Sequence, residues 1–524
     1  GWNSMSSGNA NPDGISSGKI ALLIAAITLG ITLAKLYSAQ RLYEPSYHRA
    51  PGEPPGSRSA WPTSRPRPMP TFSSNDRSRW ATVRALVDDG TFVVGTRDPK
   101  IYVITGVTQI LQTDVWNALP QVAVGLSARI SSSKGICFED GWQTVDLVLH
   151  PNDLQFYSTK PPLLSFLVAG EYWVIKKLTG WNIRDNPFGV VSLVLFTINT
   201  LPFLLYLYLI WKLICRFTTS ELAQVFVFTV ASLGTIVLPF LNTLNNHSMA
   251  VFSILFAVYC LVRIMEKAKA EELGRWGGGL WFMAMGLCTG FAVVNELPAL
   301  AFLGLAGSVV LFQFPRQTFA FFVPMALLPI AGLLWVNYLA LGQFRPAYSE
   351  FGGPWYTYEG SHWRVFPGMV RRGIDWAGYN GEGKITYGFH LLFGHHGFFS
   401  LNPVFLLSAI AFVVVPFKKN IPQVLKLITI LSAILGVIVI WFYLFKSDNY
   451  GGFTVGPRWL MWLVPLFLIS MTPVVESWMK SPFLMILLML LLVFTVMAAN
   501  YPGWSAWRHP WIYDAMMDAG WSGY

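Results

Sequence analysis

The clearest pattern along the chain is a succession of long apolar runs separated by polar segments. A run of about twenty apolar residues is long enough to cross a bilayer as a helix. The runs predict about eleven transmembrane helices, so we expect an all-α polytopic membrane protein. We place these helices at about 19–38, 188–213, 222–241, 248–265, 279–294, 298–313, 319–341, 399–416, 423–445, 459–476 and 482–499.

The predicted helices divide the chain into segments of different character. The first helix, 19–38, lacks a small-residue cleavage site and is expected to be a retained anchor. The segment after it is rich in Pro, Ser and Arg and is typical of a linker. The predicted division is a tail at 1–18, the first helix at 19–38, the linker at 39–72, a large outer loop at 73–187, helices 2–7 at 188–341, a second outer loop at 342–398, helices 8–11 at 399–499 and an aromatic-rich tail at 500–524.

The large outer loop, 73–187, predicts interfacial helices and a little β structure. Ser73 to Asp76 offer helix-capping side chains, helical spacing follows from Arg77 to Asp89, and Gly90 supplies a stop. We expect a short amphipathic helix along the membrane surface. Alternating runs at Thr91 to Val94 and Thr144 to Leu149 predict strands of a small extramembrane subdomain.

The segment from Pro161 to Leu178 decides the topology. It is short, contains Glu171 and ends in a Lys-Lys pair. If it does not span and the N-terminus is cytoplasmic, most Lys and Arg residues of the short loops fall inside, as the positive-inside rule requires. If it spans, the bias inverts. We therefore interpret it as interfacial or re-entrant, which places both outer loops and the C-terminal tail on the extracytoplasmic side of a cytoplasmic (inner) membrane.

Composition narrows the class of protein. The chain is 53% hydrophobic and only 12% charged, whereas soluble domains are about 25% charged. The net charge of +10 comes from scattered basic residues and indicates topology rather than nucleic-acid binding. Of four cysteines only Cys137 falls in a large loop, so no disulfide framework is expected.

Lys160 is the first candidate for a functional residue, because it stands where a polar loop becomes an apolar helix. Pro161 and Pro162 follow it, and two prolines suit the first turn of a helix and hold the preceding residue extended. The ammonium group either anchors the loop among lipid headgroups or binds a specific anion.

Asp76 is the second candidate. A carboxylate at a helix N-terminus is favoured in its ionised form, which suits a general base. The alternative is a helix cap without a catalytic role.

Two further outer segments place polar groups beside predicted helices. Asn245-Asn246-His247 and Asn295-Glu296 lie at membrane depth, where polar groups often mark functional sites, or they are ordinary hydrated turns. His395 and His396 are adjacent on a glycine-flanked loop, which does not make a metal-ligand set, so no metal site is predicted.

Arg458 follows Gly456-Pro457 and precedes Trp459 at the start of a predicted helix. An arginine fork suits phosphate oxygens, and the nearby glycines allow close backbone approach. The alternative is a headgroup anchor.

Together these segments resemble the GT-C glycosyltransferases, most closely the family 39-like branch of lipid A aminoarabinose transferases and protein O-mannosyltransferases. The resemblance covers most of 73–475. It is strongest at Tyr157 to Leu164 and weaker at Asn75 to Trp80 and Gly456 to Leu460. The chain departs from the family in its Asn75-Asp76 pair, where Asp-Glu is usual, and in its long proline-rich linker.

The resemblance implies that Asp76 acts at the reaction centre and that Lys160 meets a lipid phosphate, with Glu296 as an alternative for Asp76. The expected activity is transfer of a sugar from a polyprenyl-phosphate donor to an envelope lipid, glycan or protein, with inversion. Arg458 is a second phosphate-binding candidate. Possible sugar or acceptor contacts are Tyr157, His247, Glu296 and His396. No cofactor is expected, a divalent metal is left open, and the other partners are membrane lipids.

Two other functions compete with transfer. A polytopic transporter would place its ionisable groups near the bilayer midplane and often shows repeated halves, whereas here the polar signal lies in outer loops. A non-catalytic envelope-assembly protein on a GT-C scaffold is the third interpretation, motivated by Asn75.

Overall fold

The structure is a computed structural model that describes residues 16–39, 48–49, 59–60, 69–71, 73–97, 133–139, 141–274, 276–358, 361–363, 383–447 and 449–521. The chain divides into two compact units. The first unit comprises Gly1–Phe72, Val174–Trp335 and Val365–Tyr524, and the second comprises Ser73–Trp173 and Val336–Arg364. Most of the predicted linker and the middle of each outer loop fall outside the described residues.

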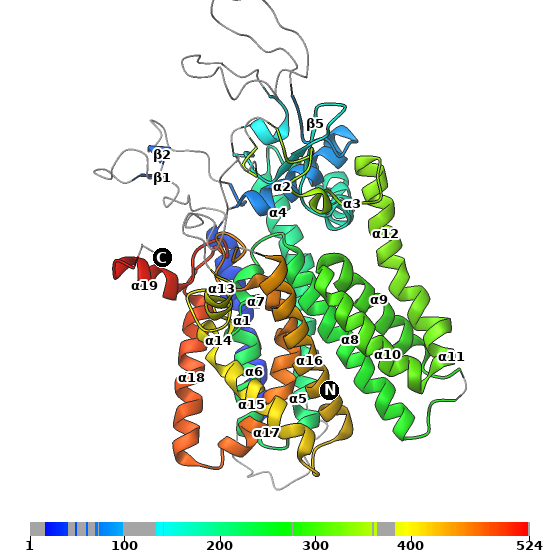
Figure 1. The fold of residues 1–524 in the computed structure, drawn as a ribbon, viewed down its shortest axis with the longest axis vertical. Coiled ribbons are helices and arrows are strands. Elements are labelled where there is room, and N and C mark those ends of the chain that lie inside the picture. The colour runs from blue at the N-terminus through cyan, green and yellow to red at the C-terminus, as the bar shows by residue number, and fades with distance from the viewer. Residues whose placement is uncertain are drawn as a thin grey trace, which may run out of the picture. The chain divides into compact units, whose positions relative to one another are not determined.

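Among the described residues, eight helical segments are long and apolar enough to cross a membrane. They are Ser17–Ser38, Pro187–Phe217, Glu221–Phe240, Asn246–Lys269, Pro315–Leu341, Gln423–Lys446, Arg458–Trp478 and Pro482–Asn500. Three shorter apolar helices, Gly279–Asn295, Leu297–Gln313 and Pro403–Phe417, take the remaining predicted positions. The predicted all-α, multi-pass class is therefore confirmed (Figure 1).

Several of these segments combine regular and irregular helical turns. The unbroken helices are α1 (Ser17–Ala39), α8 (Asn246–Lys269), α9 (Gly279–Asn295), α16 (Gln423–Lys446) and α18 (Pro482–Asn500). The composite segments are α4–η6–α5 (Pro187–Leu195, Phe196–Thr200, Leu201–Phe217), α6 and α7 (Glu221–Leu233, Val237–Phe240), η7–α10 (Leu297–Ala299, Leu300–Gln313), α11–η8–α12 (Pro315–Gln317, Thr318–Phe322, Val323–Leu341), η10–α15–η11 (Pro403–Phe405, Leu406–Val414, Val415–Phe417) and η12–α17 (Arg458–Leu463, Val464–Trp478).

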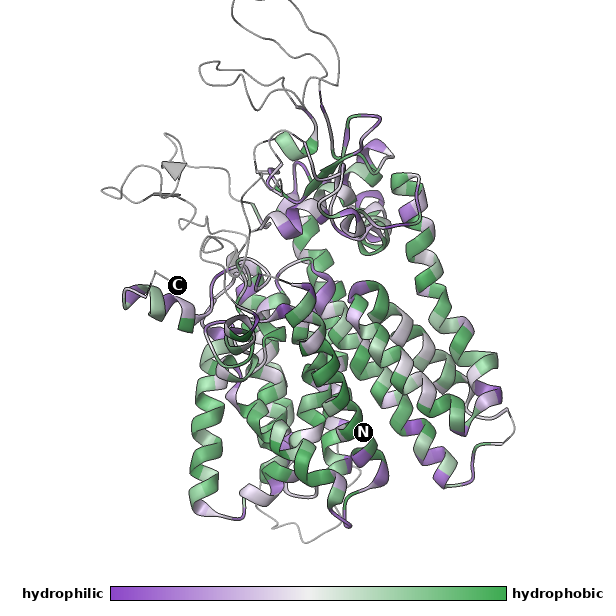
Figure 2. Cartoon of the chain, in the orientation of Figure 1, coloured by the Kyte–Doolittle hydropathy of each residue, from purple (hydrophilic) through white to green (hydrophobic). Residues whose placement is uncertain are grey.

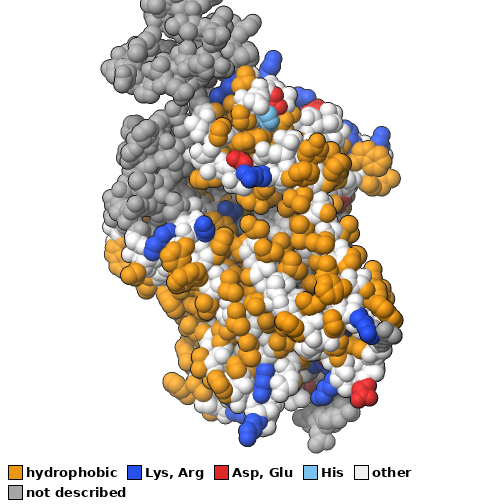
Figure 3. Space-filling model, turned by 45° about the vertical axis from the view of Figure 1, so that its right-hand side comes forward, with side chains coloured by type: hydrophobic (Ala, Val, Ile, Leu, Met, Phe, Trp, Pro, Cys, Tyr) orange, Lys and Arg blue, Asp and Glu red, His pale blue; other side chains and the backbone are white. Residues whose placement is uncertain are grey.

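Hydropathy follows the helices of the first unit. Hydrophobic residues fill the middle of these helices, and hydrophilic residues gather at their ends and in the connecting loops (Figure 2). The space-filling view shows a face covered largely by hydrophobic side chains, with several Lys and Arg side chains at its lower end (Figure 3). Exposed apolar surface on this scale is what lipid-facing helices require.

Two glycines bring α9 against the η8–α12 segment. Gly286 and Gly290 lie one helical turn apart, and a Cβ atom built on them would lie 2.2 Å from the Phe322 carbonyl oxygen and 2.1 Å from the Ala326 carbonyl oxygen. No side chain fits there. This is the small-residue packing that holds transmembrane helices together where lipid removes the hydrophobic driving force.

The second unit is built around one short sheet and one buried helix. Helix α2 (Ser74–Arg84) continues into the π-helical turn η2 (Ala85–Asp89) and ends at Gly90 with φ +68°. Strands β3 (Gly95–Thr96), β4 (Leu147–Leu149) and β5 (Gln155–Ser158) form an antiparallel sheet with β5 in the middle, and helix α3 (Pro162–Thr179) follows β5.

The core of the second unit joins the sheet to the start of the second outer loop. The apolar residues Val148 and Tyr157 from the sheet pack with Ala340 and Leu341 at the end of α12 and with Trp355. Short helices η5 (Ile136–Phe138) and η9 (Ala347–Glu350) also belong to this unit.

Two expectations for the outer loop need correction. The predicted surface helix forms where expected, but α2 is buried on nearly every side, because sheet strands and loops cover it. The first strand begins later than Thr91, since the Thr91 hydroxyl accepts from the Val93 amide in a turn and only Val94 reaches the Phe156 carbonyl.

Helix α3 is not among the described helices that are long and apolar enough to span a membrane.

The remaining elements of the first unit are α13 (Lys384–Leu392), α14 (Phe398–Leu401), α19 (Trp511–Asp518) and the two-residue parallel strands β1 (His48–Arg49) and β2 (Ser59–Ala60).

Replacing Gly290 by alanine tests the close packing of α9. The added Cβ meets a backbone carbonyl that cannot rotate away, so we expect Gly290→Ala to destabilise the purified protein by about 1–3 kcal/mol, seen as a lower thermal midpoint in detergent. Gly304 in α10 has nothing within 4 Å of its Cβ position, so Gly304→Ala is the matched control and should leave the midpoint unchanged or slightly higher. Equal midpoints for the two variants would contradict this packing.

Candidate functional site

Asp76 occupies the third position of α2 and completes a capping box. Its Oδ1 accepts a hydrogen bond of 2.8 Å from the Ser73 backbone N–H, while the Ser73 hydroxyl accepts from the Asn75 amide at 3.0 Å. The residue is only 1% exposed. The capping role is therefore present, with Ser73 rather than Asp76 as the N-cap itself.

The register of the sheet decides what lies beside Lys160. Leu147 pairs with Ser158 in the antiparallel β4–β5 ladder, so the next pair outward is Asp146 with Thr159. The Thr159 amide donates to the Asp146 carbonyl at 3.0 Å, in agreement with that register. Because Pro161 has no N–H, the ladder cannot continue beyond this point.

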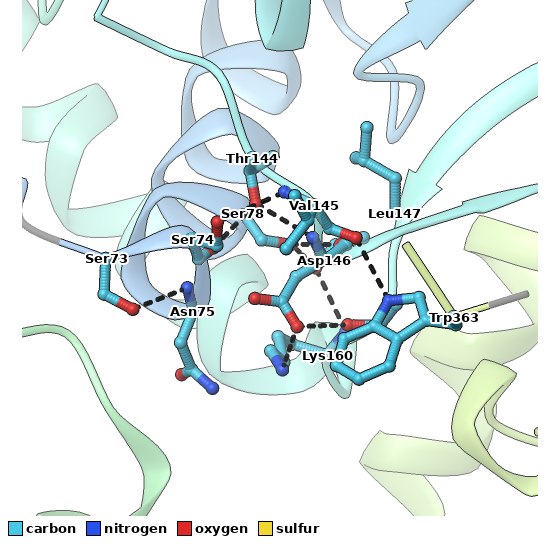
Figure 4. A network of polar contacts seen from close by, with 12 residues as sticks. Ser73, Ser74, Asn75, Ser78, Thr144, Val145, Asp146, Leu147, Lys160 and Trp363 are labelled. Carbon is cyan, nitrogen blue, oxygen red and sulfur yellow. Dashed lines mark hydrogen bonds and ion pairs between the residues drawn. The ribbon is translucent and has the colours of Figure 1, made fainter. Parts of the chain in front are cut away.

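Lys160 and Asp146 form an ion pair at the end of the ladder. The Nζ atom lies 2.7 Å from Asp146 Oδ1, and the two side chains are 18% and 7% exposed (Figure 4). A headgroup anchor would extend its ammonium group into the lipid interface, but here the ammonium binds a buried carboxylate. Lys160 is thus held in a defined place by a partner that the sequence analysis missed.

Hydroxyl groups join the ion pair to helix α2. The Ser78 hydroxyl donates to the Asp146 carbonyl at 2.8 Å and contacts the Ser158 hydroxyl, which in turn accepts from the Lys160 amide at 3.1 Å. The Thr144 hydroxyl donates to the Ser74 carbonyl at 2.8 Å. These bonds tie the helix that carries Asp76 to the loop that carries Lys160 (Figure 4).

Trp363 closes the same network from the second outer loop. Its indole N–H donates to the Val145 carbonyl at 3.0 Å. Trp363, more than two hundred positions along the chain, therefore lies beside the end of the strand next to Asp146.

Asn75 stands where the resembled family carries an acid. Its backbone and side-chain oxygens both accept from the Arg79 guanidinium one turn later, the former at 2.9 Å. Both residues are buried. An amide therefore takes the place of a second carboxylate beside Asp76, and its oxygen is already satisfied by arginine.

Tyr157 points into the core of the second unit. Its hydroxyl donates to Gln155 Oε1 at 3.0 Å, and its ring lies in the cluster with Val148 and Trp355. Burial, together with the charge of Asp153, raises the pKa of Tyr157 to about 12, so the phenol stays neutral near pH 7.

In the first unit, His247 and Glu296 form a buried pair at one end of α8. His247 Nδ1 contacts Glu296 Oε1, and the Asn246 amide donates to the same oxygen at 3.1 Å. Asn245 caps α8 by accepting from the Ser248 amide at 2.8 Å. The two polar segments singled out in the sequence therefore meet.

Arg458 begins η12, directly after the glycine-containing turn. Gly451 and Gly452 have φ of +95° and +72°, and a Cβ on Gly451 would lie 3.0 Å from Arg458 Nε. The guanidinium lies over the Trp507 ring, 5.1 Å from its centroid. The glycines thus do allow close backbone approach, in this case to Arg458 itself.

His396 lies in a cluster of histidine rings within the first unit. Among the described residues, no group of three or more His, Cys, Asp or Glu side chains is arranged to hold a metal ion.

The predicted residues thus fall into two sets. Asp76, Lys160 and Tyr157 belong to the second unit, and the structure joins the first two through one polar network. Arg458, His247, Glu296 and His396 belong to the first unit. In the sequence, Asp146 is a single acidic residue just before a short apolar run. Only the register of the strands shows that Lys160 is its partner.

Comparisons with known proteins come from structures alone. No protein-family model matches the chain, and no curated protein sequence matches it. The fold is similar to ArnT from Cupriavidus metallidurans in the apo state, with 14% identity, 88% of this chain and 61% of that chain covered, and a TM-score of 0.46. For the same protein bound to undecaprenyl phosphate, identity is 12%, coverage is again 88% and 61%, and the TM-score is 0.43.

A third similar structure is the oligosaccharyltransferase of Archaeoglobus fulgidus in the apo form. Identity is 12%, 95% of this chain and 57% of that chain are covered, and the TM-score is 0.46. This chain spans about three fifths of the length of the matched proteins, so its own activity, substrates and partners are matters for proposal.

Proposed function

We propose that this protein transfers a sugar from a polyprenyl-phosphate donor to a lipid, glycan or protein of the cell envelope, with inversion at the anomeric carbon. The observation that carries the proposal is the Lys160–Asp146 pair at the start of α3. In this pair the Lys160 side chain is partly exposed and already held in place before a ligand binds. The pair lies at the end of a polar network that also includes the helix carrying Asp76.

Lys160 suits the role of the phosphate ligand. Its side chain is 18% exposed, and its ammonium group is fixed by the Asp146 carboxylate. The α3 N-terminus adds partial positive charge close by. Pro161 and Pro162 have no backbone N–H, so they cannot donate hydrogen bonds to the phosphate. A phosphate is already a good leaving group, and its departure requires mainly that growing negative charge be stabilised.

Asp146 suits the role of a positioning residue. Its carboxylate holds Lys160 in place before the donor binds, and its carbonyl is fixed by Ser78 and Thr159. A carboxylate at this distance also raises the cost of binding a phosphate anion. We infer that the phosphate joins or displaces Asp146 at the ammonium group when the donor binds.

Asp76 suits the role of the base that accepts the acceptor's proton. The helix N-terminus favours its ionised form, and the capping box fixes the carboxylate orientation. Direct attack by the deprotonated acceptor opposite the leaving phosphate gives inversion.

The remaining assignments come from the polar outer segments of the sequence. Arg458 would be the second phosphate ligand, and Tyr157, His247, Glu296 and His396 would contact sugar or acceptor. The positive-inside bias supports a cytoplasmic (inner) membrane location with the site on the extracytoplasmic face.

Lys160 variants test the phosphate role. Lys160→Gln removes the charge and with it a charge-assisted hydrogen bond to the phosphate. We therefore expect donor turnover to fall about 10- to 100-fold. Lys160→Arg keeps the charge and should retain part of the activity. The assay is transfer from a synthetic polyprenyl-phosphate sugar, with acceptors drawn from envelope extracts and detected by mass spectrometry.

A double variant separates catalysis from folding. Lys160→Gln leaves Asp146 buried and unpaired, which costs up to about 3–5 kcal/mol of stability. Adding Asp146→Asn removes that charge and should recover the thermal midpoint without recovering turnover. Near-normal turnover in either glutamine variant would overturn the phosphate role of Lys160.

Asp76→Asn distinguishes a base from a helix cap. Asparagine keeps an oxygen that accepts from the Ser73 amide, so the capping box survives while the proton acceptor is lost. We expect transfer to fall about 10²- to 10⁴-fold with an unchanged thermal midpoint. Ser73→Ala is the converse control and should lower stability by about 1 kcal/mol with activity retained. Full activity in Asp76→Asn would leave Asp76 with the capping role alone.

Labelling of engineered cysteines tests the proposed topology. In a cysteine-free background, we expect Ser361→Cys and Ala519→Cys to react with an impermeant maleimide from the extracytoplasmic side. Ala519 is exposed, whereas Ser505 in the same tail is only 3% exposed. Lys419→Cys, in the exposed turn before α16, should react only after permeabilisation. Labelling of Ser361→Cys only after permeabilisation would show that 161–178 spans.

A further inference from the structure

Four histidine rings meet at one end of the first unit. His390 comes from α13, His395 and His396 from the loop between α13 and α14, and His509 from the tail before α19. The sequence analysis noted only the adjacent pair, because the other two rings are brought in by the fold.

The rings contact one another directly. His390 and His395 stack with centroids 4.2 Å apart, and Nδ1 of His395 lies 2.5 Å from Nδ1 of His396. His396 also approaches His509, with centroids 6.0 Å apart. This contact fits a hydrogen bond in which one neutral ring donates and the other accepts.

Aromatic side chains complete the cluster and connect it to two other segments. Tyr450 stacks on His396 at 5.1 Å, and Tyr513 stacks on His509 at 4.0 Å. Phe453 lies 4.5 Å from His509. The cluster thus packs the C-terminal tail against the turn at 449–453.

Tight backbone packing fixes the loop that carries the rings. A Cβ on Gly394 would lie 2.1 Å from His390 Nδ1, and one on Gly397 would lie 2.2 Å from the Ser400 hydroxyl. The rings therefore have little freedom to separate while the loop stays closed.

Burial makes these rings costly to protonate. His396 is 0% exposed, and its Nε2 atom and the Nδ1 atom of His509 are buried without a hydrogen-bond partner among the described residues. Burial, and then the neighbouring His390 and His509 rings, lower the pKa of His395 to about 3. Burial and the other three rings lower the pKa of His396 well below its ordinary value, and burial lowers the pKa of His509 to about 4.

The charged groups on the surrounding elements have their own contacts. On α13, the Lys384 ammonium donates to the Ser447 carbonyl, and on the tail Asp514 accepts from the Tyr501 hydroxyl. The others on these elements are Arg458, Arg508 and Asp518, and Asp448 lies outside the described residues.

We propose that the cluster is a pH-sensitive latch, which holds the C-terminal tail against the 449–458 turn while His395, His396 and His509 are neutral and releases the tail when these rings take up protons. The tail and turn are also joined by the Val455 amide donating to the Ala506 carbonyl at 3.2 Å and by Arg458 lying over Trp507. Release therefore loosens the surroundings of Arg458. This inference does not rest on the proposed transfer activity.

The direction of the pH effect follows from the lowered pKa values. In the open state the rings take up protons with an ordinary pKa of 6.5, whereas in the closed cluster the pKa is about 3 for His395, about 4 for His509 and well below the ordinary value for His396. The latch is therefore fully stable above about pH 6.5 and weakens as the pH falls toward 4. For each ring that gains a proton on opening, the open population rises about 30-fold from pH 7.5 to pH 5.

Hydrogen–deuterium exchange of the full chain in detergent tests the latch. After correction for the intrinsic pH dependence of exchange, we expect protection of 505–521 to fall at least about 30-fold between pH 7.5 and pH 5. His396→Phe/His509→Phe keeps ring contacts but removes two proton sites, so its loss of protection should be at least tenfold smaller. His362→Phe, in the second unit, is the control and should behave as wild type.

Two results would overturn the latch. One is an unchanged tail in the wild type at pH 5, and the other is an equal loss of protection in the wild type and the double variant. If the double variant does not fold, His509→Phe alone carries the same test, because its half-buried ring already stacks on Tyr513 and phenylalanine preserves that contact.

Discussion

The antiparallel register of β4 and β5 is the constraint on which the candidate site depends. It places Asp146 opposite Thr159, one residue before Lys160, and the following prolines end the ladder there. The ion pair is then a consequence of backbone pairing, since a shift of one residue would turn Asp146 to the other face of the sheet. Because the β4–β5 pairing fixes Asp146, the ion pair holds the otherwise flexible Lys160 side chain in a defined position.

The long apolar helices could be read from the sequence, because a lipid-facing helix needs about twenty apolar residues whatever it packs against. The shorter apolar helices, such as Gly279–Asn295, could also be predicted, because polar turns separate them from the adjacent helices. What the pattern could not show was burial of α2. Its polar residues Ser78, Arg79 and Arg84 resemble a solvated face, but each is buried with a partner.

Candidate residues were predictable where their own chemistry is conspicuous, as for Lys160 before two prolines or Arg458 after Gly-Pro. Their partners were not. Asp146 is one acid in an apolar run, and Glu296 meets His247 from another helix. His390 stacks on His395 from the helix before it, and His509 approaches His396 from a segment more than a hundred residues away. Such pairs depend on strand register and helix packing, which periodicity does not encode.

The structure handles buried ionisable groups in two opposite ways. Lys160 lies beside a carboxylate at the end of a polar network, so each charge of the pair has a partner of opposite sign. The histidine rings contact one another and aromatic rings instead. Burial lowers the pKa of His396 well below its ordinary value. Since an unpaired buried charge costs several kcal/mol, protonation of these rings destabilises their packing, and we expect acid sensitivity at the C-terminal tail of the first unit.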